Sequence, residues 1–202
     1  LNLVYRLGLL SGYYRLITPR TAYPARHEHQ QTPARKLEFI TRLLSLAQPG
    51  KASSRRVIKV ADAITQGRYP LYGNIPTPIQ FNTPYNIHWT RYELGRVSSG
   101  VADIKDIWEP ARFSWACTLA QAYHLKRDEK YPGFFWDRFD AFVSNNPPNT
   151  GPHWMNGQEV ALRMISFVFA WQSFLDSPKT TAERTGKLQA VLIAHAERIS
   201  AT

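Results

Sequence analysis

The 202-residue sequence is poor in cysteine, in acidic side chains and in long apolar runs. Its single cysteine, Cys117, excludes an intrachain disulfide framework and a cysteine-based zinc cluster. The longest apolar run, from Met164 to Trp171, is far shorter than the ~18 residues that a membrane-spanning helix requires. Only 15 Asp and Glu stand against 25 Lys and Arg, and the resulting net charge of +10 favours an anionic partner.

Motifs of several common enzyme and binding classes are also missing. There is no GxGxxG, no Walker motif, no HExxH and no GxSxG. The six histidines lack the spacing of metal ligands, apart from the weak pair His27 and His29, so we expect no metal and no cofactor. The cations are scattered, and no helix-turn-helix, zinc-finger or RNP-like run is present, so we do not expect a nucleic-acid partner.

What the sequence does contain is enough apolar and aromatic material for one packed domain. Hydrophobic residues make up 44% and aromatic residues 13%, which excludes a disordered basic tail. The length suits one ordinary domain, so we treat residues 1–202 as a single unit. The sequence begins at Leu1 and stops inside a helical pattern, and we therefore expect a fragment truncated at both ends.

Hydrophobic periodicity predicts an all-α fold, arranged as an array or toroid of antiparallel helix hairpins. Residues 18–33 are rich in Pro, His and Gln and are predicted to form a linker-like loop. Prolines divide residues 68–89 into short strand-like pieces, while residues 103–202 form the core helical array. The helices are expected within residues 1–16, 32–47, 53–66, 104–125, 129–144, 156–175 and 181–202.

The first candidate site lies on the helix predicted over residues 104–125. Lys105, Trp108, Arg112 and Trp115 share one face, and the spacing of Glu109 lets it bridge both cations. Tryptophan stacks on sugar rings and arginine binds carboxylate or sulfate with two donors, which suits a sugar-acid ligand. The alternative is structural, with the tryptophans in the core and a Glu–Arg pair at the surface.

The second candidate site lies at the start of the helix predicted over residues 156–175. Asn156, Glu159 and Arg163 follow one another at i, i+3 and i+7, beside a stripe of core residues, where groove-lining side chains are expected. His153 and Trp154 follow a loop rich in Pro and Gly just upstream. The alternative for His153 is a solvated or capping residue.

These segments together resemble the N-terminal domain of the heparinase II/III-like polysaccharide lyases. The resemblance rests on a Lys, a Trp-Glu pair and an Arg within residues 103–112, on Asn146-Pro147, on Gly-x-x-Trp over 151–154 and on Glu-x-x-x-Arg over 159–163. It implies an incomplete α/α toroid, followed in the family by a β-sandwich domain that these 202 residues do not contain. It also implies β-elimination at the uronic acids of an acidic polysaccharide, heparan-sulfate-like or alginate-like, and favours a periplasmic or secreted location.

The resemblance also carries site residues over to this chain. The family's Asn-His pair and Tyr base are expected beyond Thr202, so no catalytic residue is assigned here and the fragment alone is expected to be inactive. His153 stands where the family usually has Asn, which puts the substrate contact of that position in doubt. The substrate-binding candidates are Lys105, Trp108, Glu109, Arg112, His153, Trp154, Asn156, Glu159 and Arg163.

Two other functions stay open at this point. One is a non-catalytic protein that binds acidic polysaccharide during exopolysaccharide or capsule assembly. In such a protein the downstream Asn-His pair and Tyr are expected to be missing. The other is an inverting glycoside hydrolase with Glu109 and Glu159 as its acid–base pair. An Arg lies at pairing distance on the helix of each Glu, and such a pair would keep the carboxylates ionised and make them poor general acids.

Overall fold

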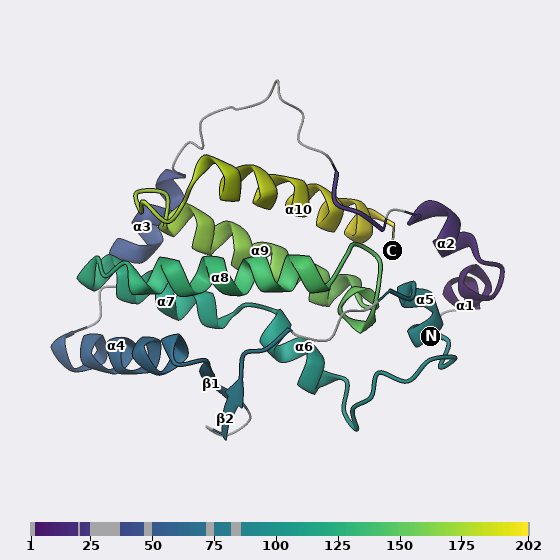
Figure 1. Ribbon diagram of the computed structural model, residues 1–202, viewed down its shortest axis with the longest axis horizontal. Coiled ribbons are helices and arrows are strands. Elements are labelled where there is room, and N and C mark those ends of the chain that lie inside the picture. The colour runs from purple at the N-terminus through teal and green to yellow at the C-terminus, as the bar shows by residue number, and fades with distance from the viewer. Residues whose placement is uncertain are drawn as a thin grey trace.

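The computed structural model describes residues 3–19, 21–24, 37–46, 50–71, 75–81 and 86–201, and these residues form a mostly helical fold (Figure 1). The prediction of an all-α domain with one short strand-like segment is confirmed. The elements are α1 (Leu3–Leu10), α2 (Tyr13–Ile17), α3 (Glu38–Leu46), α4 (Lys51–Thr65), β1 (Arg68–Leu71), β2 (Ile75–Pro78), α5 (Trp89–Glu93), α6 (Lys105–Ala111), α7 (Trp115–Lys126), α8 (Lys130–Asn145), the 3-10 turn η1 (Pro152–Trp154), α9 (Gly157–Ser173) and α10 (Ala182–Ser200).

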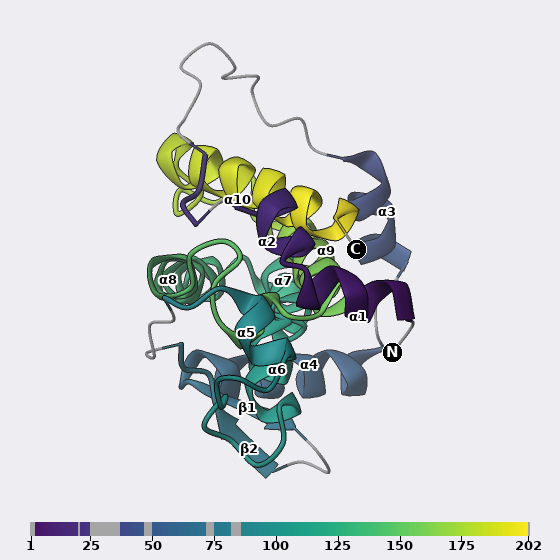
Figure 2. The same ribbon diagram turned by 90° about the vertical axis from the view of Figure 1, so that its right-hand side faces the viewer.

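Two antiparallel helix hairpins, α7–α8 and α9–α10, form the centre of the fold. The hairpins lie side by side, because α9 packs against both α7 and α10. Helices α7 and α9 run in the same direction, and α8 and α10 return in the opposite one (Figure 1). Helix α4 packs on the other side of α7, so that α10, α9, α7 and α4 form a row, which Figure 2 shows from its end.

Aromatic side chains fill the space between these helices. Phe113 lies at the centre, with its ring centroid 4.7 Å from that of Phe167, 4.8 Å from Trp115 and 5.2 Å from Phe81. All four side chains are buried, and they connect the β-hairpin region to α7 and α9. The high aromatic content of the sequence is therefore used mainly for packing.

The prediction of a single helix over residues 104–125 is wrong, because the structure divides this range into α6 and α7. Pro110 has no N–H to donate within α6, and Phe113 takes a left-handed conformation with φ of 57°. The break turns Trp115 into the core, where its Nε1 donates to the carbonyl of Pro110 at 3.0 Å. Trp115 therefore does not share an accessible face with Lys105 and Trp108, and its structural alternative holds.

The proline-rich segment forms a small antiparallel hairpin of β1 and β2, with Pro70 opposite Pro76 and Arg68 opposite Pro78. Each strand has one neighbour in this two-stranded sheet, so a proline costs no ladder bond on its outer edge. Helix α5 follows and begins at Trp89, a short helix that the periodicity does not predict.

The N-terminal helices lie at one end of the molecule, next to α5 (Figures 1 and 2). The helix predicted over residues 1–16 is divided into α1 and α2, since Gly12 has a φ of 79°. Most of the linker-like loop predicted over residues 18–33, including His27 and His29, lies outside the described residues. Within the described ranges, no helix is both long enough and apolar enough to cross a lipid bilayer.

Candidate functional site

The two candidate segments meet through Arg112, which binds two glutamates at once. Its Nε donates to Oε2 of Glu159 and its Nη2 to Oε1 of the same carboxylate, both at 2.6 Å, while its Nη1 donates to Glu109. Arg112 caps the end of α6 and Glu159 lies in the first turn of α9, so this cluster ties the two elements together. Hydrogen bonding to Glu159 is the largest of the effects that raise the pKa of Arg112 above its usual value.

The pair of Arg112 with Glu109 follows the sequence spacing, but the partner of Glu159 differs from the one that the spacing favours. We expected Arg163 to pair with Glu159 on their shared helix, but Arg112 reaches Glu159 from another element. The Nε and Nη2 donors of Arg112, which the sequence assigns to a ligand carboxylate, thus bind a carboxylate of the protein. Both glutamates of the glycoside hydrolase hypothesis bind this one cation, an arrangement that does not suit a general acid.

A second structural feature is the turn over residues 152–155, whose carbonyl groups accept hydrogen bonds from side chains. Trp108 Nε1 donates to the carbonyl of Pro152 at 2.9 Å, and Arg163 Nη2 donates to that of His153 at 3.0 Å. Arg198 donates to the carbonyls of Trp154 and Met155 at 2.9 and 2.7 Å. A buried carbonyl that finds no donor is costly, so these bonds hold the turn in place.

Glycine is required where this turn begins. Gly151 has a φ of 75° and a ψ of 177°, a combination that is essentially restricted to glycine. Its N–H donates to the carbonyl of Ile87 at 2.8 Å, and Trp89 N–H donates to the carbonyl of Asn149 at 3.0 Å. The loop before the turn is therefore fixed to the start of α5, and Asn156 next caps α9 by accepting from the N–H of Gln158 at 2.8 Å.

Arg163 is a buried cation that binds neutral acceptors. Besides the carbonyl of His153, it donates from Nε to Nε2 of His195 at 2.9 Å, and His195 Nδ1 lies 2.8 Å from the carbonyl of Val191. Its guanidinium lies 4.8 Å from the ring centre of Phe142. Burial lowers the pKa of Arg163 to about 10, still high enough to keep it charged at neutral pH.

The two histidines in this region are held neutral. Burial, followed by the nearby charge of Arg163, lowers the pKa of His153 to about 3. The same two causes lower the pKa of His195 well below its usual value. Since His195 accepts from Arg163 through Nε2, its single proton lies on Nδ1, facing the carbonyl of Val191.

Stability is therefore expected to fall in mild acid. His153 is neutral in the folded state down to about pH 3, whereas an unfolded chain protonates it below its ordinary pKa of 6.5. Below that pH the unfolded state binds a proton that the folded state does not, so the free energy of unfolding falls by about 1.4 kcal/mol per pH unit for this residue. Urea unfolding at a series of pH values between about 7 and 4.5 measures this fall in the free energy of unfolding. His153→Asn is expected to make the profile less steep, since only the contribution of His195 remains, and an identical slope in both proteins would contradict the assignment.

The nine predicted site residues divide into an accessible group and a buried group. Lys105 is exposed, and Trp108, Glu109, Arg112 and Asn156 are partly exposed. The buried residues offer almost no side-chain surface to a ligand, and they support the turn and the start of α9 instead: His153, Trp154, Glu159 and Arg163.

Sequence reasoning missed the residues that α10 and α5 contribute to this support. Arg198 Cζ lies 4.0 Å from the ring centre of Trp89, between that indole and the turn whose carbonyls it binds. A signal exists in the sequence, because His195 and Arg198 fall at i+7 and i+10 from Leu188, on the stripe of α10 that is buried. A histidine and an arginine in an apolar stripe indicate a buried polar network.

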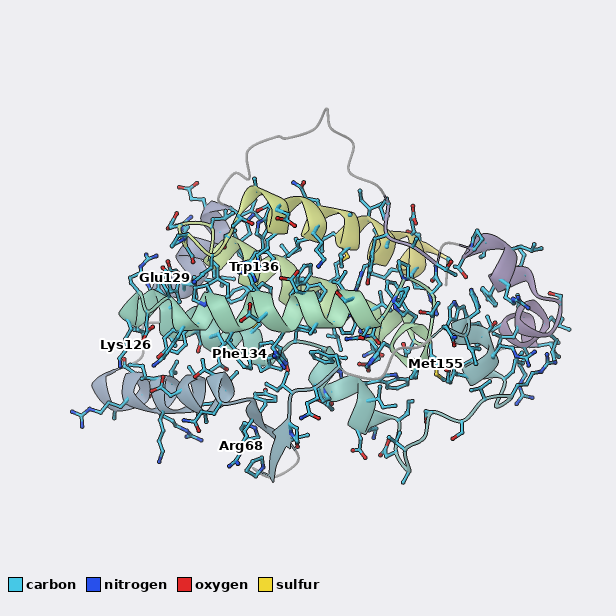
Figure 3. All side chains as sticks on the ribbon, in the orientation of Figure 1. Arg68, Lys126, Glu129, Phe134, Trp136 and Met155 are labelled. Carbon is cyan, nitrogen blue, oxygen red and sulfur yellow. The ribbon has the colours of Figure 1, made fainter. Side chains whose placement is uncertain are left out.

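The described residues contain no cluster of three or more His, Cys, Asp or Glu side chains that could hold a metal ion. A surface recess of about 550 Å³ is lined by α4 and Lys126, and none of the nine predicted residues lines it. Lys126 and Met155 lie toward opposite ends of the long axis (Figure 3), so this recess is distant from the turn. The turn and its neighbours on α6 and α9 are the candidate site.

Comparison with known proteins gives one family. Residues 26–201 match the model described as the heparinase II/III N-terminus, a range that includes α6, α9 and α10. No curated protein and no solved structure matches the chain.

Proposed function

The chain belongs to the heparinase II/III N-terminus family, and from this we propose that it forms the substrate-binding part of a polysaccharide lyase. The ligand that we propose is an acidic, uronic-acid-containing polysaccharide of the heparan-sulfate or alginate type. The proposal assigns binding to this chain, and it assigns none of its residues to the abstraction of the sugar's C5 proton. The family match is the observation that carries it.

The accessible residues support a carbohydrate ligand. Trp108 is partly exposed, and its indole is oriented by the hydrogen bond to Pro152, so a sugar ring can stack on a face that is already fixed. Glu109 and Arg112 beside it offer acceptors and remaining N–H donors for hydroxyl groups. Two donors of Arg112 already bind Glu159, so we propose that the acidic group of the sugar binds Lys105 instead, which is exposed and lies one turn away from Trp108.

Substituting Trp108 is expected to weaken polysaccharide binding by about tenfold. Trp108→Ala removes the stacking surface, whereas Trp108→Phe keeps a ring and loses only the bond to Pro152, so its loss should be smaller. Lys105→Gln is expected to weaken binding about threefold and to reduce its salt dependence. Calorimetric titration with heparan sulfate and with alginate measures these changes, and circular dichroism checks the folding of each variant.

Lys179→Gln is the matched control, because Lys179 is an exposed lysine between α9 and α10, outside the proposed site. If it weakens binding as much as Lys105→Gln, the interaction reflects the net charge of the chain and the proposed site is wrong. Binding without any unsaturated product, measured as ultraviolet absorbance in a protein that also contains the downstream domain, would favour the non-catalytic binding protein. An absence of binding to both polysaccharides would overturn the proposal.

A further inference from the structure

Helices α1 and α2 present large aliphatic side chains to solvent. Leu3, Leu7 and Leu10 share one face of α1 and are 71%, 56% and 65% exposed. Val4 lies beside them, and Leu16 on α2 is 77% exposed. We call these five residues the N-terminal apolar face. A soluble domain seldom leaves so many large aliphatic residues uncovered within one short segment.

The opposite side of the same helices is anchored to the body of the protein. Leu9 is buried in a cluster with Trp89 and Trp154, and the ring of Tyr14 lies 5.9 Å from that of Trp89. At the end of α2, the carbonyl of Thr18 lies 3.0 Å from Nε2 of His88. The two helices are thus fixed by one side, and the fixed side determines that the N-terminal apolar face points outward.

The charge that this N-terminal segment itself carries has one sign. The first 27 residues contain four arginines and no acidic residue. Arg6 on α1 and Arg15 on α2 are both exposed, and Arg6 flanks the row formed by Leu3, Leu7 and Leu10. Exposed aliphatic side chains flanked by arginines are the pattern of a helix that lies in the interface of an anionic membrane.

We propose that the N-terminal apolar face docks on an anionic lipid surface, with its leucines inserted at the level of the headgroups and Arg6 and Arg15 paired with lipid phosphates. Leucine and valine are under-represented among the residues that dominate protein–protein binding, whereas they are well suited to insertion among acyl chains. The membrane would be bound at the end of the molecule that carries α1 and α2 (Figure 1). This association is independent of the proposed polysaccharide site.

Co-sedimentation of the 202-residue chain with lipid vesicles tests the proposal. We expect binding to vesicles of phosphatidylglycerol and phosphatidylcholine, weakening with added salt, and much weaker binding to phosphatidylcholine alone. The variant Leu3→Ser/Leu7→Ser/Leu10→Ser is expected to bind at least about tenfold more weakly, because three inserted side chains are lost. Arg6→Gln/Arg15→Gln should lose most of the preference for the anionic vesicles.

The matched control is Ile165→Ser, which removes an exposed isoleucine of α9, outside the N-terminal apolar face. It is expected to bind vesicles like the unmodified chain. Equal binding to neutral and anionic vesicles, or equal weakening by the control, would overturn the proposal. The proposal would also be overturned if the chain did not bind vesicles but formed dimers, detected by light scattering, and the triple variant abolished these dimers. A second copy of the chain would then cover the N-terminal apolar face.

Discussion

Replacing Arg163 by Met is expected to lower the free energy of unfolding by about 3 kcal/mol. The guanidinium donates to the carbonyl of His153 at 3.0 Å and to Nε2 of His195 at 2.9 Å, and all three groups are buried. Methionine fills a similar volume but leaves these acceptors without a donor, which costs about 1–3 kcal/mol for each. Removal of a buried charge offsets part of that cost, so the lower half of the summed range is the reasonable expectation.

Urea unfolding followed by tryptophan fluorescence measures this change. Arg163→Lys keeps the charge, but a single ammonium cannot reproduce the planar fork, so it should be destabilised nearly as much. Arg184→Met is the matched control, since Arg184 is a more accessible arginine that pairs with Asp137 and Asp140, and its loss should cost less than about 1 kcal/mol. Equal stabilities of Arg163→Met and the unmodified protein would show that the two acceptors find other donors.

Replacing Phe113 by Ala is expected to lower the free energy of unfolding by about 4 kcal/mol. The ring is fully buried and packs against aromatic side chains on several elements, so its removal costs both transfer free energy and a cavity. Its backbone, with φ of 57°, favours glycine by about 1 kcal/mol. The packing loss is several times larger than the conformational cost, which explains why a phenylalanine occupies a left-handed position.

The two contributions are separated by comparing substitutions at this position. Phe113→Gly should be about 1 kcal/mol more stable than Phe113→Ala, although both remain far below the unmodified protein. Arg127→Gly tests mainly the conformational part, because Arg127 is an exposed residue with φ of 55°. Its ion pair with Asp176 and its contact with Tyr123 lie at the surface and contribute little. We expect it to be neutral or slightly stabilising. Thermal unfolding measures all three, and a glycine variant less stable than the alanine variant would contradict the argument.

Periodicity predicted the helices whose apolar stripe faces one large core. The expected ranges 129–144 and 156–175 agree closely with α8 and α9, and the proline pattern of residues 68–89 correctly indicated strands. The break between α6 and α7 was missed because Trp108, Arg112 and Trp115 keep a helical spacing across it. Pro110 was the local signal, but the left-handed Phe113 depends on contacts with residues distant in the sequence.

The candidate site was predicted as a set of segments, and its pairing was not. Sequence spacing relates residues on one helix, so it pairs Glu159 with Arg163 and gives Arg112 only Glu109 as a partner. In the structure the first turn of α9 meets the end of α6, and Arg112 is the cation that reaches Glu159. Arg163 faces the other way, toward His195 on α10. Such choices depend on how the helices are packed, which a pattern along one helix does not contain.

The four bonded carbonyls of residues 152–155 have a consequence for the order of folding. Their donors are Trp108, Arg163 and Arg198, which come from three helices spread over much of the chain. Bringing such distant segments together costs chain entropy before the contacts between them contribute any stability. The turn therefore has no stable form of its own in a partly folded chain. The site should therefore complete its geometry after the helix hairpins have assembled, and the amide protons of the turn should exchange with solvent through partial unfolding that leaves the hairpins intact.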